Sequence, residues 1–228
     1  MIPGVGHDMI PVATAAGAGG LMITMALAAN MALGKGESAV IPAGRFSLKG
    51  FFEAFLEMVV GLSEMVVGKD GIKFVPIFAS VFLYIWVNNL IGLLPGMTPA
   101  TDNLNTTLAV GLFSFILYNF YGFKEHGIAY LKQLVGPFNG ILLLLIGPLM
   151  LCIETISHAV RPLSLALRLF GNMTGDHAVV SVFLDLVPGW LPIPVIFYLL
   201  GMFVCTVQAF VFTLLTMIYV SMAISHDH

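Results

Sequence analysis

Long apolar runs constrain the fold of this chain more than any other feature of its sequence. A helix that crosses the roughly 30 Å of hydrocarbon in a bilayer needs about 20 apolar residues, because its backbone must satisfy its own hydrogen bonds there. Such runs cover residues 12–33, 74–94, 106–123, 138–187 and 191–224. Only 9% of the 228 residues are charged, against roughly 25% in a soluble domain. We therefore predict an all-α integral membrane protein whose first three runs are upright transmembrane helices, and we exclude a soluble enzyme and a disordered chain.

The net charge and the cysteines exclude further classes. Nine Lys and Arg against twelve Asp and Glu leave a net charge of -3, which is too small to attract a nucleic acid. Cys152 and Cys205 lie inside apolar runs, which is typical of small core residues and not of a disulfide framework. The sequence contains no glycine-rich phosphate loop. We expect no nucleic-acid partner, no cofactor and no direct binding of ATP.

Residues 47–67 differ from the other apolar segments because glutamates interrupt them. Phenylalanines and aliphatic residues recur there at helical spacing, between Glu53, Glu57 and Glu64. This pattern predicts an amphipathic helix that lies at the membrane interface and does not cross it.

The two C-terminal runs are too long for simple upright helices. As continuous helices, residues 138–187 and 191–224 would measure about 75 Å and about 51 Å. Either the first run holds two upright helices, or both runs are long helices that lie strongly tilted in the membrane. Hydropathy does not distinguish these alternatives. We divide the chain into residues 1–73, 74–137 and 138–228, with the interfacial helix in the first region.

The distribution of basic residues predicts the orientation of the chain in the membrane. Residues 1–33 and 95–105 contain no Lys or Arg. The connection at 34–73 carries five, which are Lys35, Arg45, Lys49, Lys69 and Lys73. We therefore expect the N-terminus outside and this connection on the cytoplasmic side. The side of the C-terminus depends on whether residues 138–187 cross once or twice.

Ionisable side chains inside the first long C-terminal run are the main clue to function. Glu154, Arg161 and Arg168 are seven residues apart and fall near one helical face. Asn172 and Asp176 extend this face in steps of four. An arginine within a membrane span costs at least about 2.5–3.5 kcal/mol, and a guanidinium does not escape that cost by losing its proton. Arg168 must therefore face water, a carboxylate or a partner protein.

Each polar residue also has a purely structural interpretation. An arginine that pairs with Glu154 or Asp176 would only join helices. A histidine side chain is suited to proton relay, so His177 is a relay candidate, but a lone histidine is also typical of a satisfied interior hydrogen bond. Gln208 is the only other strongly polar side chain at mid-depth in the last run, and by itself it indicates helix–helix contact.

Two other interpretations fail on spacing. A serine protease built from Ser164, His177 and Asp185 lacks a recognisable nucleophile motif around the serine. A metal site built from Glu154, His158 and His177 lacks a known ligand spacing.

Residues 162–177, PLSLALRLFGNMTGDH, resemble the signature of subunit a of the F-type ATP synthases. Three further stretches are similar to that family in the same order. They are NNLIGLLPG at 88–96, ATDNLNTTLAVGL at 100–112 and VQAFVFTLLTMIYVSMA at 207–223. The resemblance extends over about residues 75–224, whereas the first 70 residues agree only in general plan.

The resemblance implies a non-catalytic stator subunit of a rotary motor, in a bacterial inner membrane. Its partners would be membrane lipid, the peripheral-stalk b subunits and a ring of c subunits that each carry an essential carboxylate. The two C-terminal helices would form a long tilted hairpin with a cytoplasmic C-terminus. Arg168 would be the essential arginine between two aqueous half-channels, so that proton flow drives ring rotation and ATP synthesis.

The resemblance also assigns further residues to the ion path. The residues that flank the arginine are Asn172 and Gln208. The outlet residues, toward the cytoplasm, are Glu154, Ser157 and Arg161. The inlet residues, toward the outside, are His177, Asn89, Asp102 and Asn105.

One position departs from the family's pattern. Members often pair the inlet residue with a second ionisable group on the last helix, seven residues before the glutamine, and this chain has Gly201 there. Asp176 or Asp185 is the candidate replacement. We expect Asp176 and His177 to form the inlet relay jointly.

Two functions of other classes are alternatives to the motor. A stand-alone secondary transporter would have its site at Arg168, but the sequence has no visible inverted repeat. A structural membrane anchor would tolerate the loss of Arg168. For the motor, His177 favours H⁺ over Na⁺ as the transported ion.

Overall fold

The computed structural model describes residues 9–33, 47–94, 97–127, 130, 141–186 and 193–225. Within these ranges the chain forms helices only, in the order α1 (Ile10–Leu33), α3 (Leu48–Val67), η2 (Lys69–Phe74), α4 (Val75–Gly92), η3 (Ala100–Asp102), α5 (Leu104–His126), α7 (Ile141–Leu186) and α8 (Ile193–Ile224). The predicted all-α fold is confirmed. Residues 141–186 form one helix, so two separate upright helices are not found in this stretch.

Local sequence signals explain where the shorter helices begin and end. The Ser47 hydroxyl caps α3 by accepting a hydrogen bond from the Gly50 amide at 3.1 Å. The helix ends at Gly68, whose φ of 85° is accessible to glycine at little cost. Pro76 lies in the first turn of α4, where no backbone donor is needed. Asn103 caps α5 through its side-chain oxygen.

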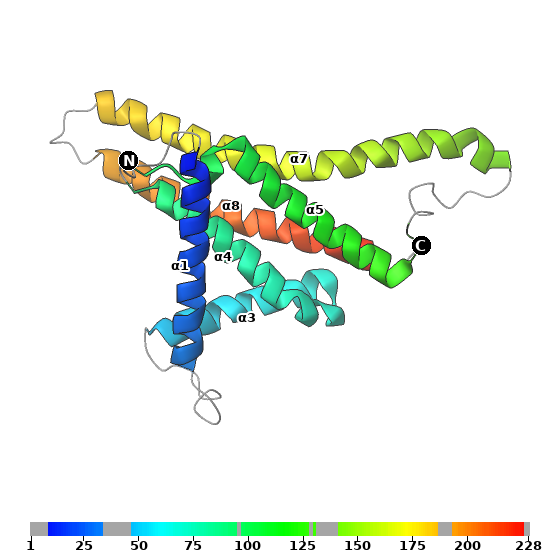
Figure 1. The fold of residues 1–228 in the computed structure, drawn as a ribbon, viewed down its shortest axis with the longest axis horizontal. Coiled ribbons are helices and arrows are strands. Elements are labelled where there is room, and N and C mark those ends of the chain that lie inside the picture. The colour runs from blue at the N-terminus through cyan, green and yellow to red at the C-terminus, as the bar shows by residue number, and fades with distance from the viewer. Residues whose placement is uncertain are drawn as a thin grey trace.

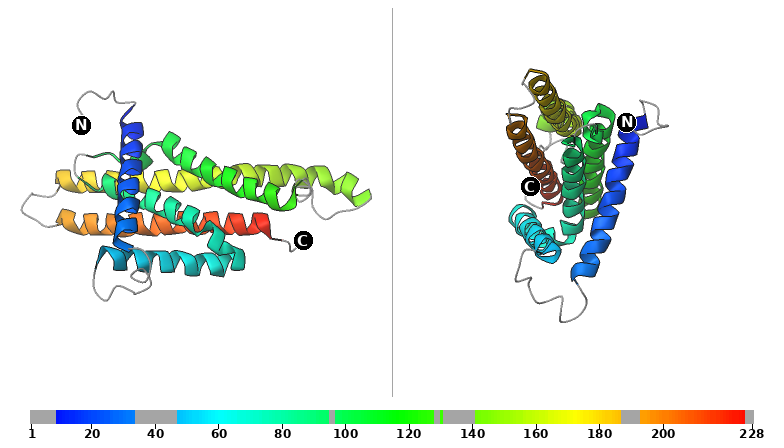
Figure 2. Two further views of the ribbon diagram at one scale, coloured as in Figure 1. Left: turned by 60° about the horizontal axis from the view of Figure 1, so that its bottom comes forward. Right: turned by 90° about the vertical axis from the view of Figure 1, so that its left-hand side faces the viewer.

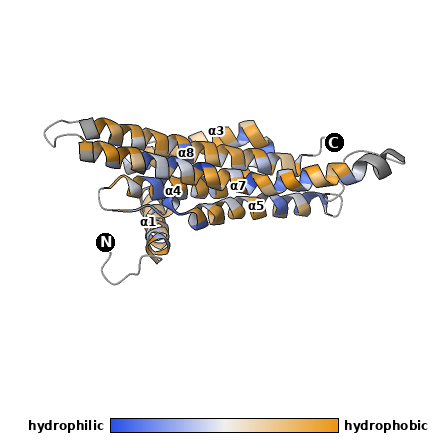
Figure 3. Ribbon diagram, turned by 90° about the horizontal axis from the view of Figure 1, so that it is seen from above, coloured by the Kyte–Doolittle hydropathy of each residue, from blue (hydrophilic) through white to orange (hydrophobic). Residues whose placement is uncertain are grey.

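The helices are arranged in a flattened bundle (Figure 1). The longest helix, α7, lies along one edge, α3 lies along the opposite edge, and α4, α5 and α8 lie between them. Helix α1 runs across the direction of α7 and α8, as Figure 2 shows from two further sides. The two long helices α7 and α8 are hydrophobic over most of their length (Figure 3). The two helices run in opposite directions, as Figure 2 shows, so they form an antiparallel pair with largely apolar surfaces.

Four described helices are long and apolar enough to cross a membrane, at Ile10–Met31, Lys69–Gly92, Leu104–His126 and Val195–Ile224. Helix α7 is not one of these four, and it is the helix that carries Glu154, Arg161, Arg168 and Asp176. The apolar core lies where α4, α5, α7 and α8 meet, around Phe78, Ile85, Tyr118, Leu169 and Phe212.

Buried polar contacts join the helices around this core. Ser114 of α5 and Thr216 of α8 share a hydrogen bond of 2.9 Å. The Ser221 hydroxyl of α8 donates to the Val66 carbonyl of α3 at 2.8 Å. Gly111 allows α5 to approach α7 closely, because a Cβ there would lie 2.6 Å from the Pro162 carbonyl oxygen.

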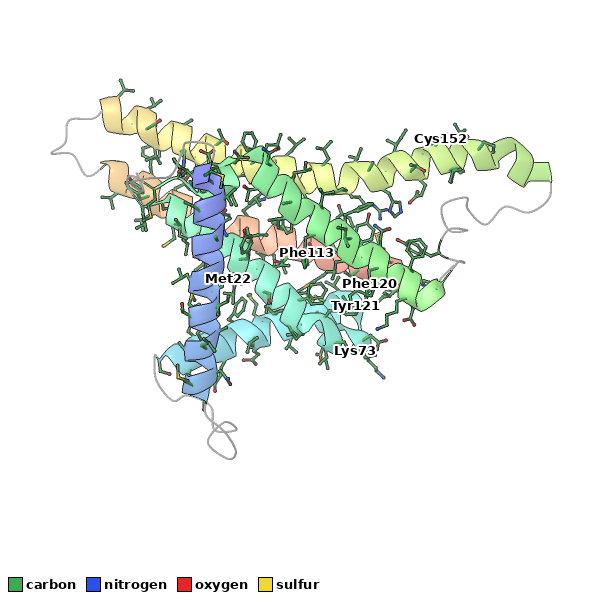
Figure 4. The ribbon with its side chains drawn as sticks, in the orientation of Figure 1. Met22, Lys73, Phe113, Phe120, Tyr121 and Cys152 are labelled. Atoms are coloured by element: carbon green, nitrogen blue, oxygen red, sulfur yellow. The ribbon has the colours of Figure 1, made fainter. Side chains whose placement is uncertain are left out.

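A separate cavity of about 860 Å³ lies between α1, α4 and α5. Met22 and Phe113, both labelled in Figure 4, belong to its largely apolar lining. Cys152, also labelled in Figure 4, is exposed on α7, and α7 contributes no residue to the lining of this cavity.

Candidate functional site

The predicted site residues on α7 fall into three groups along its axis. Glu154 lies 14 residues before Arg168, which corresponds to about 21 Å along a helix, and His177 lies nine residues after it, or about 14 Å. The groups around these three residues are too far apart to contact one another directly.

Arg168 forms the central group. Its neighbours Leu165, Ala166 and Leu169 are almost fully buried, so they occupy the inward face of α7, whereas Arg168 itself is exposed. It forms no hydrogen bond or ion pair with any residue that the structure describes. The interpretation that Arg168 only joins helices by pairing with Glu154 or Asp176 therefore finds no support here. The guanidinium is left for water or for a partner.

Apolar side chains surround this arginine on the outer face of α7. Exposed aliphatic residues recur every three or four positions, at Ile156, Val160, Leu163 and Leu167. An exposed apolar stripe of this kind on a membrane protein faces lipid or another protein. Arg168 adds a single permanent charge beside that stripe.

A polar contact between α7 and α8 lies one helical turn beyond the arginine. The Asn172 amide donates a hydrogen bond of 2.6 Å to the Gln208 side-chain oxygen. The two residues that the sequence predicts to flank the arginine are therefore brought together. Around them, Asn89, Asp176 and Cys205 help to line a space too tight for a water molecule.

A second polar group lies where η3 meets the C-terminal part of α7. Asp102 accepts a hydrogen bond from the Thr174 hydroxyl at 2.7 Å, and its other carboxylate oxygen is 3.8 Å from Nδ1 of His177. A cleft of about 510 Å³ opens beside these side chains. Its polar lining consists of Asp102, Thr174, Asp176, His177, Ser181 and Tyr198. The cleft offers water a route to the His177 and Asp176 side chains.

Gly201 lies directly opposite Asp176. A Cβ built on Gly201 would be 2.7 Å from Oδ2 of Asp176 and 2.8 Å from Leu93. The aspartate thus occupies the space into which a side chain at position 201 would project. Its Oδ2 is buried and has no hydrogen-bond partner among the described residues. The side chain of Asp185, the other candidate acid, lies outside the described part of the structure.

The third group lies nearer the start of α7. Glu154 is 3.7 Å from the Arg161 guanidinium and 3.4 Å from Nε2 of His158. The Arg161–Glu154 pair lies within one helix, so it does not join helices in the way that the structural alternative required. The Arg161 guanidinium also lies over the rings of Tyr219, at 5.3 Å, and Tyr118, at 6.0 Å. Ser157 is half-buried on the same stretch of α7.

Two predicted inlet residues, Asn89 and Asn105, do not line the cleft beside His177. Asn89 is 1% exposed and accepts a hydrogen bond from the Thr101 hydroxyl at 2.8 Å. It therefore anchors η3 to α4 close to Asp176 and does not face the cleft. Asn105 is exposed and lines the apolar cavity between α1, α4 and α5. The structure thus separates Asn105 from the cleft that holds His177.

Sequence reasoning did not assign three residues of these groups to the ion path, and it considered one of them, His158, only as a metal ligand. Thr174 lies within the resembling string, but its role depends on Asp102, 72 residues earlier in the chain. Tyr118 reaches α7 from the middle of α5, and no local spacing predicts that contact. His158 follows Glu154 by four residues, a spacing that places both on one helical face and could have identified the pair.

Comparison with known proteins adds an independent line of information. The family model described as "ATP synthase A chain" matches residues 16–221. A protein of Bdellovibrio bacteriovorus named "ATP synthase subunit a" is 55% identical over 229 residues, covering 100% of this chain and 97% of that protein. One of the same name from Geotalea daltonii is 42% identical and covers 81% of this chain and 80% of itself. An "ATP synthase subunit a 1" of Pelobacter propionicus is 45% identical, covering 76% and 75%.

Proposed function

This chain belongs to the ATP synthase A chain family, and from that premise we propose that it is the proton-translocating stator subunit of a rotary ATP synthase. Its apolar helices and its bacterial relatives make it a membrane protein of bacteria that serves ATP synthesis and ion transport. It is a membrane-sector subunit, and the chemistry of ATP resides on other subunits. Its partners are a ring of c subunits and the b subunits of the peripheral stalk.

The observation that carries the proposal is that Arg168 is exposed beside an apolar stripe and has no ion-pair partner in the part of the chain that the structure describes. A permanent cation in this setting is costly in hydrocarbon, and among the described residues it has no counter-ion. A partner that presents a carboxylate to the same face would supply the missing charge. A ring of helices that each carry one carboxylate meets this requirement repeatedly as it turns.

The two polar groups on either side of Arg168 are the proposed half-channels. A proton enters through the cleft at Asp102, His177 and Asp176 and neutralises a ring carboxylate. The ring carries the neutral carboxyl group through lipid until it releases its proton on the side of Glu154. Arg168 favours the ionised form of the returning carboxylate and repels protons that would pass directly between the half-channels. Each charge that crosses 100 mV supplies about 2.3 kcal/mol.

The inlet relay is the pair Asp176 and His177. Both side chains line the cleft of about 510 Å³, and Asp176 fills the space opposite Gly201. The acid that many family members place on the last helix is here supplied from α7, one residue before the histidine. An imidazole exchanges protons near neutral pH, which favours H⁺ as the transported ion.

The proposed orientation puts the N-terminus outside and the C-terminus in the cytoplasm. The last turn of α5 carries Lys124 and His126, and positive charge is typical of the cytoplasmic side. Helix α7 has 46 residues, which corresponds to about 69 Å. This length exceeds the hydrocarbon thickness of about 30 Å, so α7 and its partner α8 are strongly tilted.

Replacement of Arg168 by alanine tests the proposal. In membrane vesicles that contain the assembled complex, we expect Arg168→Ala to abolish ATP synthesis driven by a proton gradient while the subunit still assembles with the c ring. Lys124→Ala removes an exposed cation at the end of α5 and should leave synthesis at the wild-type rate. Wild-type synthesis with Arg168→Ala would reject the motor function and favour a structural anchor.

A further inference from the structure

His158 is joined to groups on two helices in the polar group nearer the start of α7. Its Nδ1 is 3.1 Å from the Tyr118 hydroxyl of α5, and its Nε2 is 3.4 Å from Oε1 of Glu154. The ring therefore lies between a phenol and a carboxylate. The motor mechanism described above assigns it no role.

The surroundings hold this imidazole in one position. Tyr118 is 1% exposed and belongs to the apolar core, so its hydroxyl is a fixed partner for Nδ1. The side chains of His158, Arg161 and Glu154 are 16%, 19% and 35% exposed, in that order. Exposure thus increases from His158 toward Glu154, which places the carboxylate between the imidazole and water.

The charged and titratable groups around His158 come from three helices and from Tyr130, which interacts with Arg161 and Glu154. Tyr118 belongs to α5, Glu154 and Arg161 belong to α7, and Tyr219 of α8 lies 5.8 Å from the Tyr118 ring and under the Arg161 guanidinium. Arginine and tyrosine do not exchange protons readily near neutral pH. Within this group, His158 and Glu154 are therefore the two side chains suited to passing a proton.

We propose that His158 is a second proton-relay residue, which exchanges protons with Glu154 on the side of Arg168 opposite to His177. The inference rests on the proposed function, because it needs a proton path on that side. Tyr118 acts as a positioning residue that occupies Nδ1 and directs Nε2 at the carboxylate. Asp102, the partner of His177, lies before α5, whereas Tyr118 lies 16 residues further along the chain, so the two histidines have partners at different levels along α5.

The proton balance of the step is simple. With Nδ1 protonated and hydrogen-bonded to the Tyr118 oxygen, the Nε2 lone pair accepts a proton released by a ring carboxyl group, which gives an imidazolium and a ring carboxylate. The imidazolium then donates its Nε2 proton to the Glu154 carboxylate and returns to the neutral form. The protonated Glu154 releases the proton to water, and the reverse sequence carries a proton inward.

Passive proton conductance tests this proposal in vesicles that carry the assembled complex with its catalytic sector removed. We expect His158→Gln, which keeps hydrogen-bonding capacity but does not titrate, to lower conductance roughly ten-fold or more, since positioned proton transfer contributes about 10²–10⁴-fold. Its conductance should also lose the wild-type dependence on cytoplasmic-side pH between about 5 and 8. Added imidazole should restore conductance to His158→Ala. His126→Gln is the matched histidine control and should conduct like the wild type.

The outcomes separate this proposal from the proposed function. If His158→Gln conducts at the wild-type rate with an unchanged pH dependence, while Arg168→Ala still abolishes coupled synthesis, only the role of His158 is rejected. Should His158→Gln fail to assemble, Tyr118→Phe decides. It removes the Nδ1 partner and should shift the midpoint of the pH dependence, and an unchanged midpoint overturns the proposal.

Discussion

Asn172 of α7 donates a hydrogen bond of 2.6 Å to Gln208 of α8, one helical turn from Arg168. This contact joins the two long helices at the level where the arginine faces outward. Gln208 is 4% exposed whereas Asn172 is exposed, so the bond is partly buried and lies where α7 meets α8. The contact therefore fixes the rotation of α7 and, with it, the direction in which Arg168 projects.

Loss of the Asn172–Gln208 bond should weaken the packing of α7 on α8. We expect a coupling energy of about 0.6 kcal/mol, the average for an interhelical hydrogen bond in a membrane protein. A double-mutant cycle with Asn172→Ala and Gln208→Leu, read from unfolding in mixed micelles, measures it. A coupling energy of zero would mean that the bond does not hold the helices together.

The inlet relay predicts that Asp176 and His177 are needed together. Replacement of both, as Asp176→Asn with His177→Gln, should reduce proton-driven ATP synthesis to background, because neither an acid nor an imidazole is left in the cleft to exchange protons. Synthesis in inverted vesicles is the measurement. The single variants should each retain partial activity. If the double variant synthesises ATP normally, the relay is wrong.

Because Asp102 lies close to His177, we expect the negative charge of Asp102 to matter more for proton transfer than its hydrogen bond with Thr174. Asp102→Asn keeps an oxygen that accepts the Thr174 hydrogen bond but removes the negative charge 3.8 Å from His177. We expect slower proton release through the cleft into the lumen of inverted vesicles, measured as ATP-driven acidification of that lumen. Thr174→Val is the matched control, because it removes the hydrogen bond and keeps the charge. Slower transfer in Thr174→Val with wild-type transfer in Asp102→Asn would show that the hydrogen bond, and not the charge, is what matters.

The close approach of α5 to α7 predicts that Gly111 does not tolerate a larger residue. A Cβ there would meet the Pro162 backbone oxygen at 2.6 Å, and a backbone atom has little freedom to move. We expect Gly111→Ala to destabilise the subunit by about 1–3 kcal/mol, which outweighs the gain in helix propensity of about 1 kcal/mol.

Thermal dissociation of the purified complex measures this effect. Gly61→Ala in α3 is the control, because a Cβ there has no neighbour within 4 Å. The control should be neutral or slightly stabilising. Similar behaviour of the two variants would contradict the tight crossing of α5 and α7.

The helices themselves were predictable from the sequence. The run at 12–33 corresponds to α1 at Ile10–Leu33, and the amphipathic segment at 47–67 corresponds to α3 at Leu48–Val67. These elements depend on local quantities, namely the length of an apolar run, its periodicity and the capping or glycine residues at its ends. Hydropathy did not distinguish one helix from two over residues 138–187, because an apolar run of this length is compatible with either arrangement.

The groups within the site were predictable only in part. The resemblance placed Asn172 and Gln208 beside the arginine, but their contact with each other, the contact of Tyr118 with His158 and the position of Asn105 on an apolar cavity were not expected. These relationships depend on how α5 crosses α7. No spacing within one segment contains that information.

The sequence by itself determined that this chain belongs in a membrane and that Arg168 carries a charge that its apolar surroundings do not neutralise. Composition and ionisation are properties of individual residues, so they need no fold. Only the tertiary structure decided which charges are paired. It places Arg161 beside Glu154 and His177 near Asp102, and it leaves Arg168 exposed without a partner among the described residues. The reason is that pairing depends on which face of α7 is buried against α5 and α8.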